Sequence, residues 1–156
     1  MPVTGLSFTV IAVILAILVL LIGSAMASGA EVAFFSLGPN QLHELRMKED
    51  KADHAVLYLL EMPKRLLATL LISNNFFNVG IVIISTYVTH SLFDFAHFPY
   101  WLAFFIQVVA VTSLILLFGE VMPKVYATKN NLRFARFLAG PVRVVIAIFY
   151  PLSSLL

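Results

Sequence analysis

The stretch Leu6–Ala30, LSFTVIAVILAILVLLIGSAMASGA, decides how the chain folds because it reaches Glu31 without a single charged side chain. A transmembrane helix needs roughly 20 mostly apolar residues. The run is longer than the apolar core of a signal peptide, and no basic segment precedes it. It therefore predicts a retained membrane span over about residues 6–37.

The composition of the whole chain supports this assignment. Of its 156 residues, 61% are hydrophobic and 12% are charged, and the mean hydropathy is +0.98. Soluble domains usually contain about 45–50% apolar residues. The absence of cysteine excludes disulfides and thiolate metal sites. The net charge of +2 alone would allow a nucleic-acid partner, but the placement of the basic residues favours a membrane surface.

Two further apolar runs predict spans over about residues 66–89 and 100–127. The third run begins with the aromatic pair Tyr100–Trp101, which is typical of an anchor at the membrane interface. Polar residues between the first two runs predict short amphipathic helices over about residues 39–62. We therefore expect residues 1–156 to form one all-α integral membrane domain with three transmembrane helices and short juxtamembrane helices.

The basic residues are distributed unevenly along the chain. Five lie between the first and second spans and five lie at or beyond the end of the third, which accounts for all 10. The positive-inside rule then predicts that both basic regions lie in the cytoplasm and the N-terminus lies outside. We expect this orientation in the cell inner (plasma) membrane. The basic residues are Arg46, Lys48, Lys51, Lys64, Arg65, Lys124, Lys129, Arg133, Arg136 and Arg143.

The segment of residues 130–156 allows two interpretations, a fourth span or a helix lying in the membrane interface. Arg133, Arg136 and Arg143 fall within about 80° of one another on a helix of 3.6 residues per turn. Pro141 also interrupts the apolar run. A stripe of arginine on an apolar helix favours the interfacial interpretation.

Each predicted span carries polar residues on one face. In the first, Ser24, Ser28 and Glu31 fall within about 60° of arc. In the second, Asn74 and Asn78 are four residues apart and share a face. Polar groups inside lipid cost several kcal/mol unless they meet one another or an ion. Because the third span carries Glu120, these faces predict one shared site between three helices.

The sequence around Glu120, LLFGEVMPKVYA, suggests what this site would bind. Pro123 has no N–H, so in an α-helix the carbonyl of Gly119 loses its donor, and we expect a break in the helix there. A free carbonyl beside a carboxylate offers two hard oxygen ligands. Together with a Ser hydroxyl and an Asn carbonyl, such a set favours Mg²⁺, Ca²⁺ or Na⁺ over zinc or copper.

Simpler interpretations exist for the same residues. Small-residue runs such as GSAMASGA are typical of close helix packing, and Asn pairs often join helices by hydrogen bonds. A Gly and a Pro suffice for a plain kink. Glu31 and Glu120 could reach headgroup water or pair with Lys124. The coincidence of polar faces in all three spans favours a cation site over these alternatives.

The three motifs SGAEVAFFSL (28–37), LLISNNFFNVG (70–80) and FGEVMPKVYA (118–127) resemble the transmembrane domain of the CorC/CNNM family of magnesium transport proteins. The resemblance covers essentially the whole chain. It implies a homodimer with three transmembrane helices per subunit, a juxtamembrane helical belt and a central Mg²⁺ site. It further implies Mg²⁺ export coupled to Na⁺ entry.

Matched by motif, the resemblance implies Ser28, Asn78, Gly119 and Glu120 as metal ligands, with Asn74 in support. Pro123 would support the same segment. A coupled Na⁺ ion needs a second site, for which Glu31 with Ser24 is the candidate.

Family members normally continue into cytosolic CBS modules that bind nucleotide, so the chain is expected to be part of a longer protein. Any nucleotide would bind only through those absent modules.

Other chemistry finds little support in the sequence. HELRM (43–47) nearly matches a zinc-protease motif, but Met47 stands where the second His is required. His90, Asp94 and His97 would share a helical face, but they fall in an aromatic stretch that favours an interfacial loop. We therefore expect no enzyme and no nucleic-acid partner. The alternative to a transporter is a non-transporting membrane scaffold or cation sensor.

Overall fold

The computed structural model describes residues 3–48, 50–92 and 99–153, and within these ranges every regular element is a helix. Asp94 and His97 of the predicted outer loop lie outside the described residues. The elements are α1 (Val3–Phe35), α2 (Pro39–Met47), α3 (Lys51–Leu60), α4 (Pro63–Leu92), α5 (Tyr100–Leu114), the π-helix Ile115–Val121, α6 (Met122–Lys129) and α7 (Asn131–Ser153).

Three helices are long and apolar enough to cross a membrane, which confirms the predicted all-α membrane fold. They cover Phe8–Phe35, Pro63–Val88 and Tyr100–Lys129. The third span consists of α5, the π-helix and α6 in continuous succession. The second span begins at Pro63 rather than at residue 66, because proline fits the first turn of a helix, where its missing N–H is not needed.

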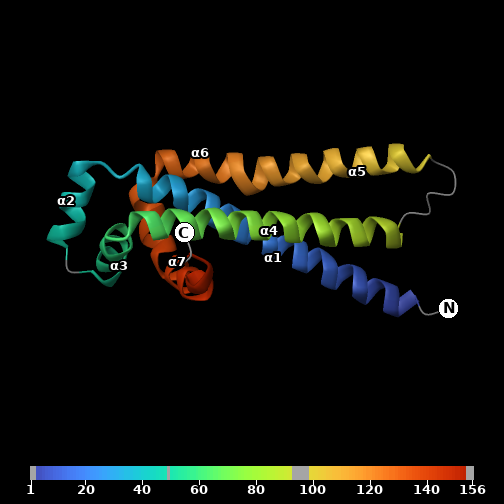
Figure 1. Cartoon of the computed structure of the whole chain (residues 1–156), viewed down its shortest axis with the longest axis horizontal. Coiled ribbons are helices and arrows are strands. Elements are labelled where there is room, and N and C mark those ends of the chain that lie inside the picture. Colours follow the sequence, from blue (N-terminus) through green and yellow to red (C-terminus); the bar gives the residue numbers. More distant parts are fainter. Residues whose placement is uncertain (1–2, 49, 93–98, 154–156) are drawn as a thin grey trace.

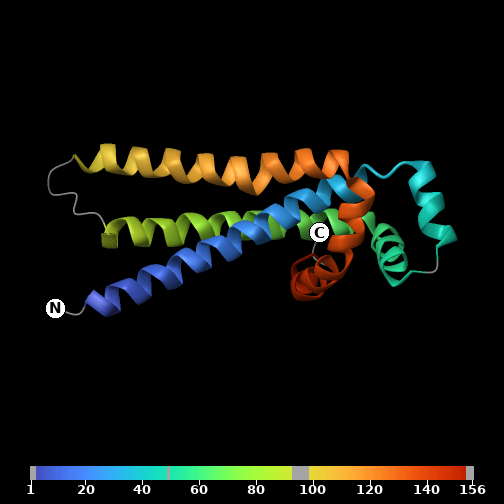
Figure 2. The same cartoon turned by 180° about the vertical axis from the view of Figure 1, so that it is seen from behind.

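The three spans run along the long axis of the molecule, and the shorter helices gather at one end (Figure 1). α4 lies beside the straight column of α5 and α6, while α1 crosses α4 at an angle and ends beside α6, as the view from behind also shows (Figure 2). α1 contacts α4, the π-helix and α6. The N-terminal end of α1 points away from the end that carries α2, α3 and α7 (Figure 2).

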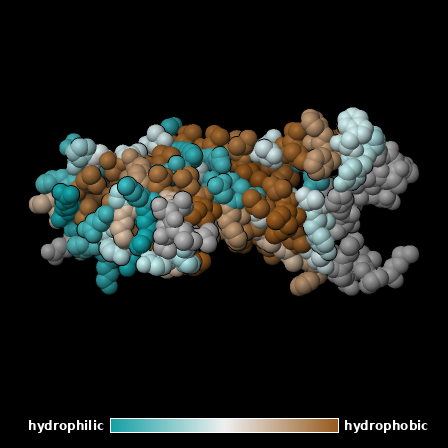
Figure 3. Space-filling view, viewed as in Figure 1, coloured by the Kyte–Doolittle hydropathy of each residue, from teal (hydrophilic) through white to brown (hydrophobic). Residues whose placement is uncertain are grey.

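Burial is concentrated at the end with the short helices. Hydrophobic side chains are exposed along much of the spans, whereas hydrophilic residues gather over α2 and α3 (Figure 3). An apolar exposed band is what a helix bundle needs to contact lipid. The buried core joins the end of α1 to α2, α3, α4, α6 and α7, and it includes Ala30, Phe34, Leu45, Val56, Leu59, Leu66, Ala127 and Leu138.

α7 lies across the ends of the spans rather than alongside them (Figure 1). It is not among the helices that could cross a membrane by length and composition. Pro141 and Pro151 lie inside it, and an internal proline removes a helical hydrogen bond and bends the helix. This arrangement agrees with the interfacial interpretation.

The predicted arginine stripe of α7 does not face the headgroups as a unit. Arg136 turns inward and holds Asp53 through two hydrogen bonds, the one from Nη2 measuring 3.2 Å. Arg143 lies over the ring of Tyr58, 5.6 Å from its centroid. Only Arg133 of the three keeps an exposed position without a partner among the described residues. Two of the three arginines of the stripe therefore have partners on α3, where the buried carboxylate of Asp53 requires a cation.

Asp53, Arg136 and Glu44 form a clamp between α3, α7 and α2. Asp53 is 1% exposed, and Nη2 of Arg136 also reaches Glu44 Oε1 at 3.2 Å. The hydrogen bonds that Arg136 donates to Asp53 raise the pKa of Arg136 further above its ordinary value. Lys48 and then Arg136 lower the pKa of Glu44 below its ordinary value of 4.5. The clamp fixes the juxtamembrane helices against α7 and so beneath the spans.

Candidate functional site

A buried serine of α1 meets the asparagine pair of α4. Ser24 is fully buried, and its Oγ lies 2.8 Å from Asn74 Oδ1 and 2.6 Å from Asn78 Oδ1. The two amides can reach the same hydroxyl because residues four apart lie on one helix face. Ser24 was predicted on the polar face of the first span and, with Glu31, as a candidate for a sodium site; the structure places it at the centre of the contacts with the two amides.

The third span closes the cluster with a carboxylate. The Nδ2 atoms of Asn74 and Asn78 each donate to Oε1 of Glu120, both at 3.4 Å. The predicted meeting of polar faces from three helices is therefore observed for these three residues and Ser24. The two amides connect the hydroxyl of Ser24 to the carboxylate of Glu120. A substitution at any one of these residues therefore changes the hydrogen bonds of the others.

The cluster has more hydrogen-bond acceptors than protons to share. Ser24 has one hydroxyl proton, so it can donate to only one of the two amide oxygens that approach it. Turning either amide around would instead place its oxygen against the carboxylate of Glu120. In either orientation two oxygens face each other, and a water proton or a cation between them would relieve the contact. The arrangement is thus compatible with a cation bound among these oxygens.

Gly119 allows the third span to approach α1. It is buried, and a Cβ atom at this residue would lie 2.9 Å from Ser24 Oγ and 3.6 Å from a methyl group of Leu21. A distance below 3.0 Å is shorter than real Cβ contacts, so a larger residue would have to displace the Ser24 hydroxyl or one of the two helices. Gly119 therefore sets the distance between α1 and the segment that carries Glu120.

The backbone around Glu120 is widened rather than broken. Residues Ile115–Val121 form a π-helix, and Met122 N–H donates to the carbonyl of Leu117, five residues earlier. Pro123 follows directly in the first turn of α6. We expected a break that frees the carbonyl of Gly119; the structure instead keeps a continuous helix with a π-helical segment. Such segments occur frequently at functional sites.

Ser28 lies one turn beyond Ser24 and is buried without a partner. Its side chain is 1% exposed, and its Oγ makes no hydrogen bond within the described chain. Leaving a buried hydroxyl unpaired costs about 1–3 kcal/mol. Such a group usually has an unseen water or ion as its partner. Thr69 on α4 is a second hydroxyl of this kind, which sequence reasoning missed although it is the lone polar residue in LLATLLI.

Glu31 takes a different partner from the one predicted for a sodium site. Its Oε2 lies 3.5 Å from Nζ of Lys124, and the two side chains are 30% and 40% exposed. The pair joins α1 to α6, as the alternative interpretation of Glu31 allowed. A second ion at Glu31 and Ser24 would therefore have to compete with the ammonium of Lys124.

Sequence comparison identifies the relatives of this architecture. The family model described as the Cyclin M transmembrane N-terminal domain, CNNM, matches residues 14–156. The chain belongs to the CNNM family. The match confirms the resemblance carried by the three span motifs.

Individual CNNM relatives come from distant organisms. A UPF0053 protein of Synechocystis is 31% identical over 145 residues, which cover 92% of this chain and 40% of the relative. A Caenorhabditis elegans protein named metal transporter cnnm-4 is 30% identical over 152 residues, which cover 90% of this chain and 31% of the relative. A DUF21 domain-containing protein of Arabidopsis thaliana is 29% identical over 156 residues, which cover 97% of this chain and 27% of the relative. The chain thus spans less than half the length of these relatives.

The donor set of this CNNM domain decides which ions suit the cluster. It offers one carboxylate, two amides and hydroxyl groups, and all their possible metal ligands are oxygens. No three His, Cys, Asp or Glu side chains gather within the described residues to hold a metal. Oxygen ligands suit Mg²⁺, Ca²⁺ and Na⁺ rather than zinc or copper. A small cation here would keep some of its water, as Mg²⁺ usually does in proteins.

Proposed function

We propose that this domain transports Mg²⁺ across the membrane through the cluster formed by Ser24, Asn74, Asn78 and Glu120. The observation that carries the proposal is the gathering of oxygen atoms from three spans around Ser24, where acceptors outnumber the hydroxyl proton and a cation could bind. The partnerless hydroxyl of Ser28 would add a ligand one turn away. That one relative is named a metal transporter supports the same class of function.

The geometry around Gly119 supports a small ion. The third span can approach α1 closely only because residue 119 has no side chain. Mg²⁺ is smaller than Ca²⁺ and requires a nearly octahedral set of oxygen ligands, with metal–oxygen distances of roughly 2.0–2.1 Å. It usually keeps several of its water ligands. A tight site with few protein oxygens therefore suits partly hydrated Mg²⁺ better than Ca²⁺, which takes six to eight ligands.

We further propose that the domain works as a homodimer that exports Mg²⁺ while Na⁺ enters. The candidate Na⁺ ligands are Glu31 and Ser24, and the ion would displace Lys124 from its pair with Glu31. Basic residues of α2, α3 and α7 would face the cytoplasm of the plasma membrane and leave the N-terminus outside. Nucleotide would act only through further domains of a longer protein.

The second candidate function is a non-transporting scaffold or cation sensor. One observation favours it: Ser24, the two amides and Glu120 already contact one another directly, as a packing network would. A scaffold would also use the clamped helices α2 and α3 as a surface for a partner. In that case substitutions in the cluster would lower stability without affecting any ion flux.

Flux measurements in proteoliposomes separate the two functions. A Mg²⁺-sensitive dye inside the vesicles reports Mg²⁺ movement with and without an opposing Na⁺ gradient. Transport predicts flux that Glu120→Gln and Asn78→Ala abolish and that Asn75→Ala preserves, because Asn75 is exposed beside the pair. A Na⁺ gradient should accelerate export if coupling holds. If vesicles that contain folded wild-type protein show no more Mg²⁺ flux than protein-free vesicles, the scaffold function is supported.

A further inference from the structure

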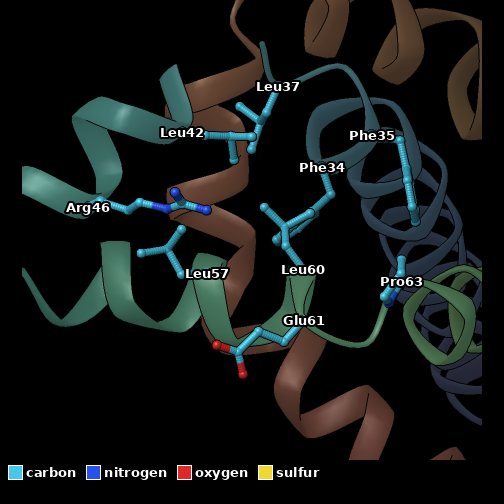
Figure 4. Close-up of a pocket in the computed structure, with 9 residues that line it drawn as sticks. All are labelled: Phe34, Phe35, Leu37, Leu42, Arg46, Leu57, Leu60, Glu61 and Pro63. Carbon is cyan, nitrogen blue, oxygen red and sulfur yellow. The ribbon is translucent and has the colours of Figure 1, made fainter. Parts of the chain in front are cut away.

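A crevice lies away from the cation cluster, between the end of α1 and the helices α2 and α3 (Figure 4). Its volume is about 450 Å³, which is in the range of roughly 300–1,000 Å³ typical of ligand pockets. Its walls are mainly apolar. They consist of Phe34, Phe35 and Leu37 near the end of α1, Leu42 of α2, and Leu57 and Leu60 of α3.

Two opposite charges complete the lining. Arg46 extends from α2 into the crevice between Leu42 and Leu57, whereas Glu61 lies at the rim below Leu60 (Figure 4). Both residues are exposed, and neither forms an ion pair with another part of the described chain. The crevice therefore offers one free cation and one free anion beside an apolar wall.

The crevice adjoins the level at which the spans leave the membrane. Phe35 ends the first candidate span and Pro63 begins the second, and both residues line the crevice. Lipid headgroups occupy the layer of several ångströms directly outside the hydrocarbon core. A molecule bound here would have its polar part among headgroups and its apolar part against the ends of the helices.

We infer that the crevice binds a phospholipid with an ethanolamine headgroup. The phosphate would accept hydrogen bonds from the guanidinium of Arg46, a planar donor suited to phosphate. The primary ammonium would donate to Glu61, and the start of an acyl chain would lie along Phe34 and Leu60. The site does not depend on ion transport, since none of its residues belongs to the cation cluster.

The two charges also discriminate between lipids. A purely anionic headgroup would satisfy Arg46 but would face the like charge of Glu61. A choline headgroup has the correct pair of charges, but its quaternary ammonium has no N–H to donate. A segment of polypeptide from a longer form of the protein would fill the apolar wall, but it would need its own matched charges.

Native mass spectrometry of the detergent-purified chain tests this inference with three dioleoyl lipids, carrying ethanolamine, choline or glycerol headgroups. We expect the ethanolamine lipid to bind most tightly. Arg46→Gln should weaken its binding about tenfold, the usual effect of losing a charge-assisted hydrogen bond. Glu61→Gln should remove the preference for ethanolamine over choline. Lys51→Gln, which removes an exposed charge of α3 outside the lining, should change neither.

Two additional probes keep the test decisive. Leu57→Trp should block the lipid while leaving both charges in place, and the melting temperature shows whether each variant is folded.

Glycerophosphoethanolamine, which has no acyl chains, should compete only weakly. Full competition by this soluble compound would identify a soluble phosphoester as the ligand and overturn the inference. Equal binding of all three lipids, unchanged by the three crevice substitutions, would also overturn it and leave a polypeptide segment as the occupant.

Discussion

Gly119 and Ser24 lie in contact across the interface of the third span and α1, so close that a Cβ atom at residue 119 would come within 2.9 Å of Ser24 Oγ. Ser24 in turn contacts both amides of α4. The absence of one side chain therefore determines the position of the hydroxyl that holds the amide pair.

Gly119→Ala should disturb the cluster without changing any of its polar groups. The added methyl group must displace Ser24 or the π-helix, and such overpacking typically costs about 1–3 kcal/mol. We expect a lower melting temperature and a reduced response to Mg²⁺. Gly140→Ala is the matched control, because a Cβ there meets no atom within 4 Å. Equal behaviour of the two variants would contradict the proposed role of Gly119.

Ser28→Ala should have opposite effects on stability and on ion binding. Without Mg²⁺, removal of an unpaired buried hydroxyl should leave the free energy of unfolding unchanged or raise it by about 1 kcal/mol. With Mg²⁺, the loss of a ligand should reduce the rise in melting temperature. Thr69→Val removes the other partnerless hydroxyl and should leave the Mg²⁺ response intact. A full Mg²⁺ response in Ser28→Ala would exclude Ser28 as a ligand.

Arg136→Ala should destabilise the juxtamembrane helices because it leaves the carboxylate of Asp53 buried and unpaired. Removal of one partner of a buried pair costs about 3–5 kcal/mol, and we expect about 2–3 here because Arg136 is itself 26% exposed. Arg133→Ala, at an exposed position of the same helix, should have little effect. Chemical denaturation in detergent measures the free energy of unfolding of both variants. If Arg136→Ala is as stable as Arg133→Ala, the clamp does not contribute to stability.

The clamp also predicts a dependence of stability on pH. Lys48 and Arg136 lower the pKa of Glu44 in the folded state, so the unfolded chain takes up the proton first as the pH falls. The stability contributed by Glu44 is thus present above its ordinary pKa of 4.5 and is lost as the pH falls through the lowered value. The melting temperatures of wild type and Glu44→Gln should differ at pH 7 and converge as the pH falls below 4.5 and through the lowered pKa of Glu44. A difference that is independent of pH would contradict this assignment.

Much of the membrane architecture follows from the sequence because a bilayer imposes strong rules. Apolar runs of sufficient length predicted three spans, and helical spacing placed Asn74 beside Asn78 before any contact was known. The convergence of these amides with Glu120 followed from the cost of leaving polar groups in lipid.

Other features depend on contacts that no local pattern specifies. The clamp joins Asp53 to Arg136 across 83 positions of the chain. A signal existed, since Asp53 shares a helix face with Val56 and Leu60 and a carboxylate on an apolar face needs a partner. The π-helix was not predicted, because Gly119 and Pro123 are equally compatible with a kink. Ser24 and Ser28 lie on the same face of α1, so helical spacing alone does not tell which of them contacts the amides. The structure selects Ser24 because of where α1 crosses α4.

The most direct test of the central claim is the melting temperature of the purified protein titrated with MgCl₂ at constant ionic strength. A ligand that binds only the folded state raises apparent stability by about 2.7 kcal/mol at 100 times its Kd. The account predicts a saturable rise in wild type and in Asn75→Ala that is lost in Asn78→Ala and Glu120→Gln. A wild-type protein that shows no Mg²⁺-specific rise, with the two cluster variants merely less stable, would contradict it and make the cluster a packing network.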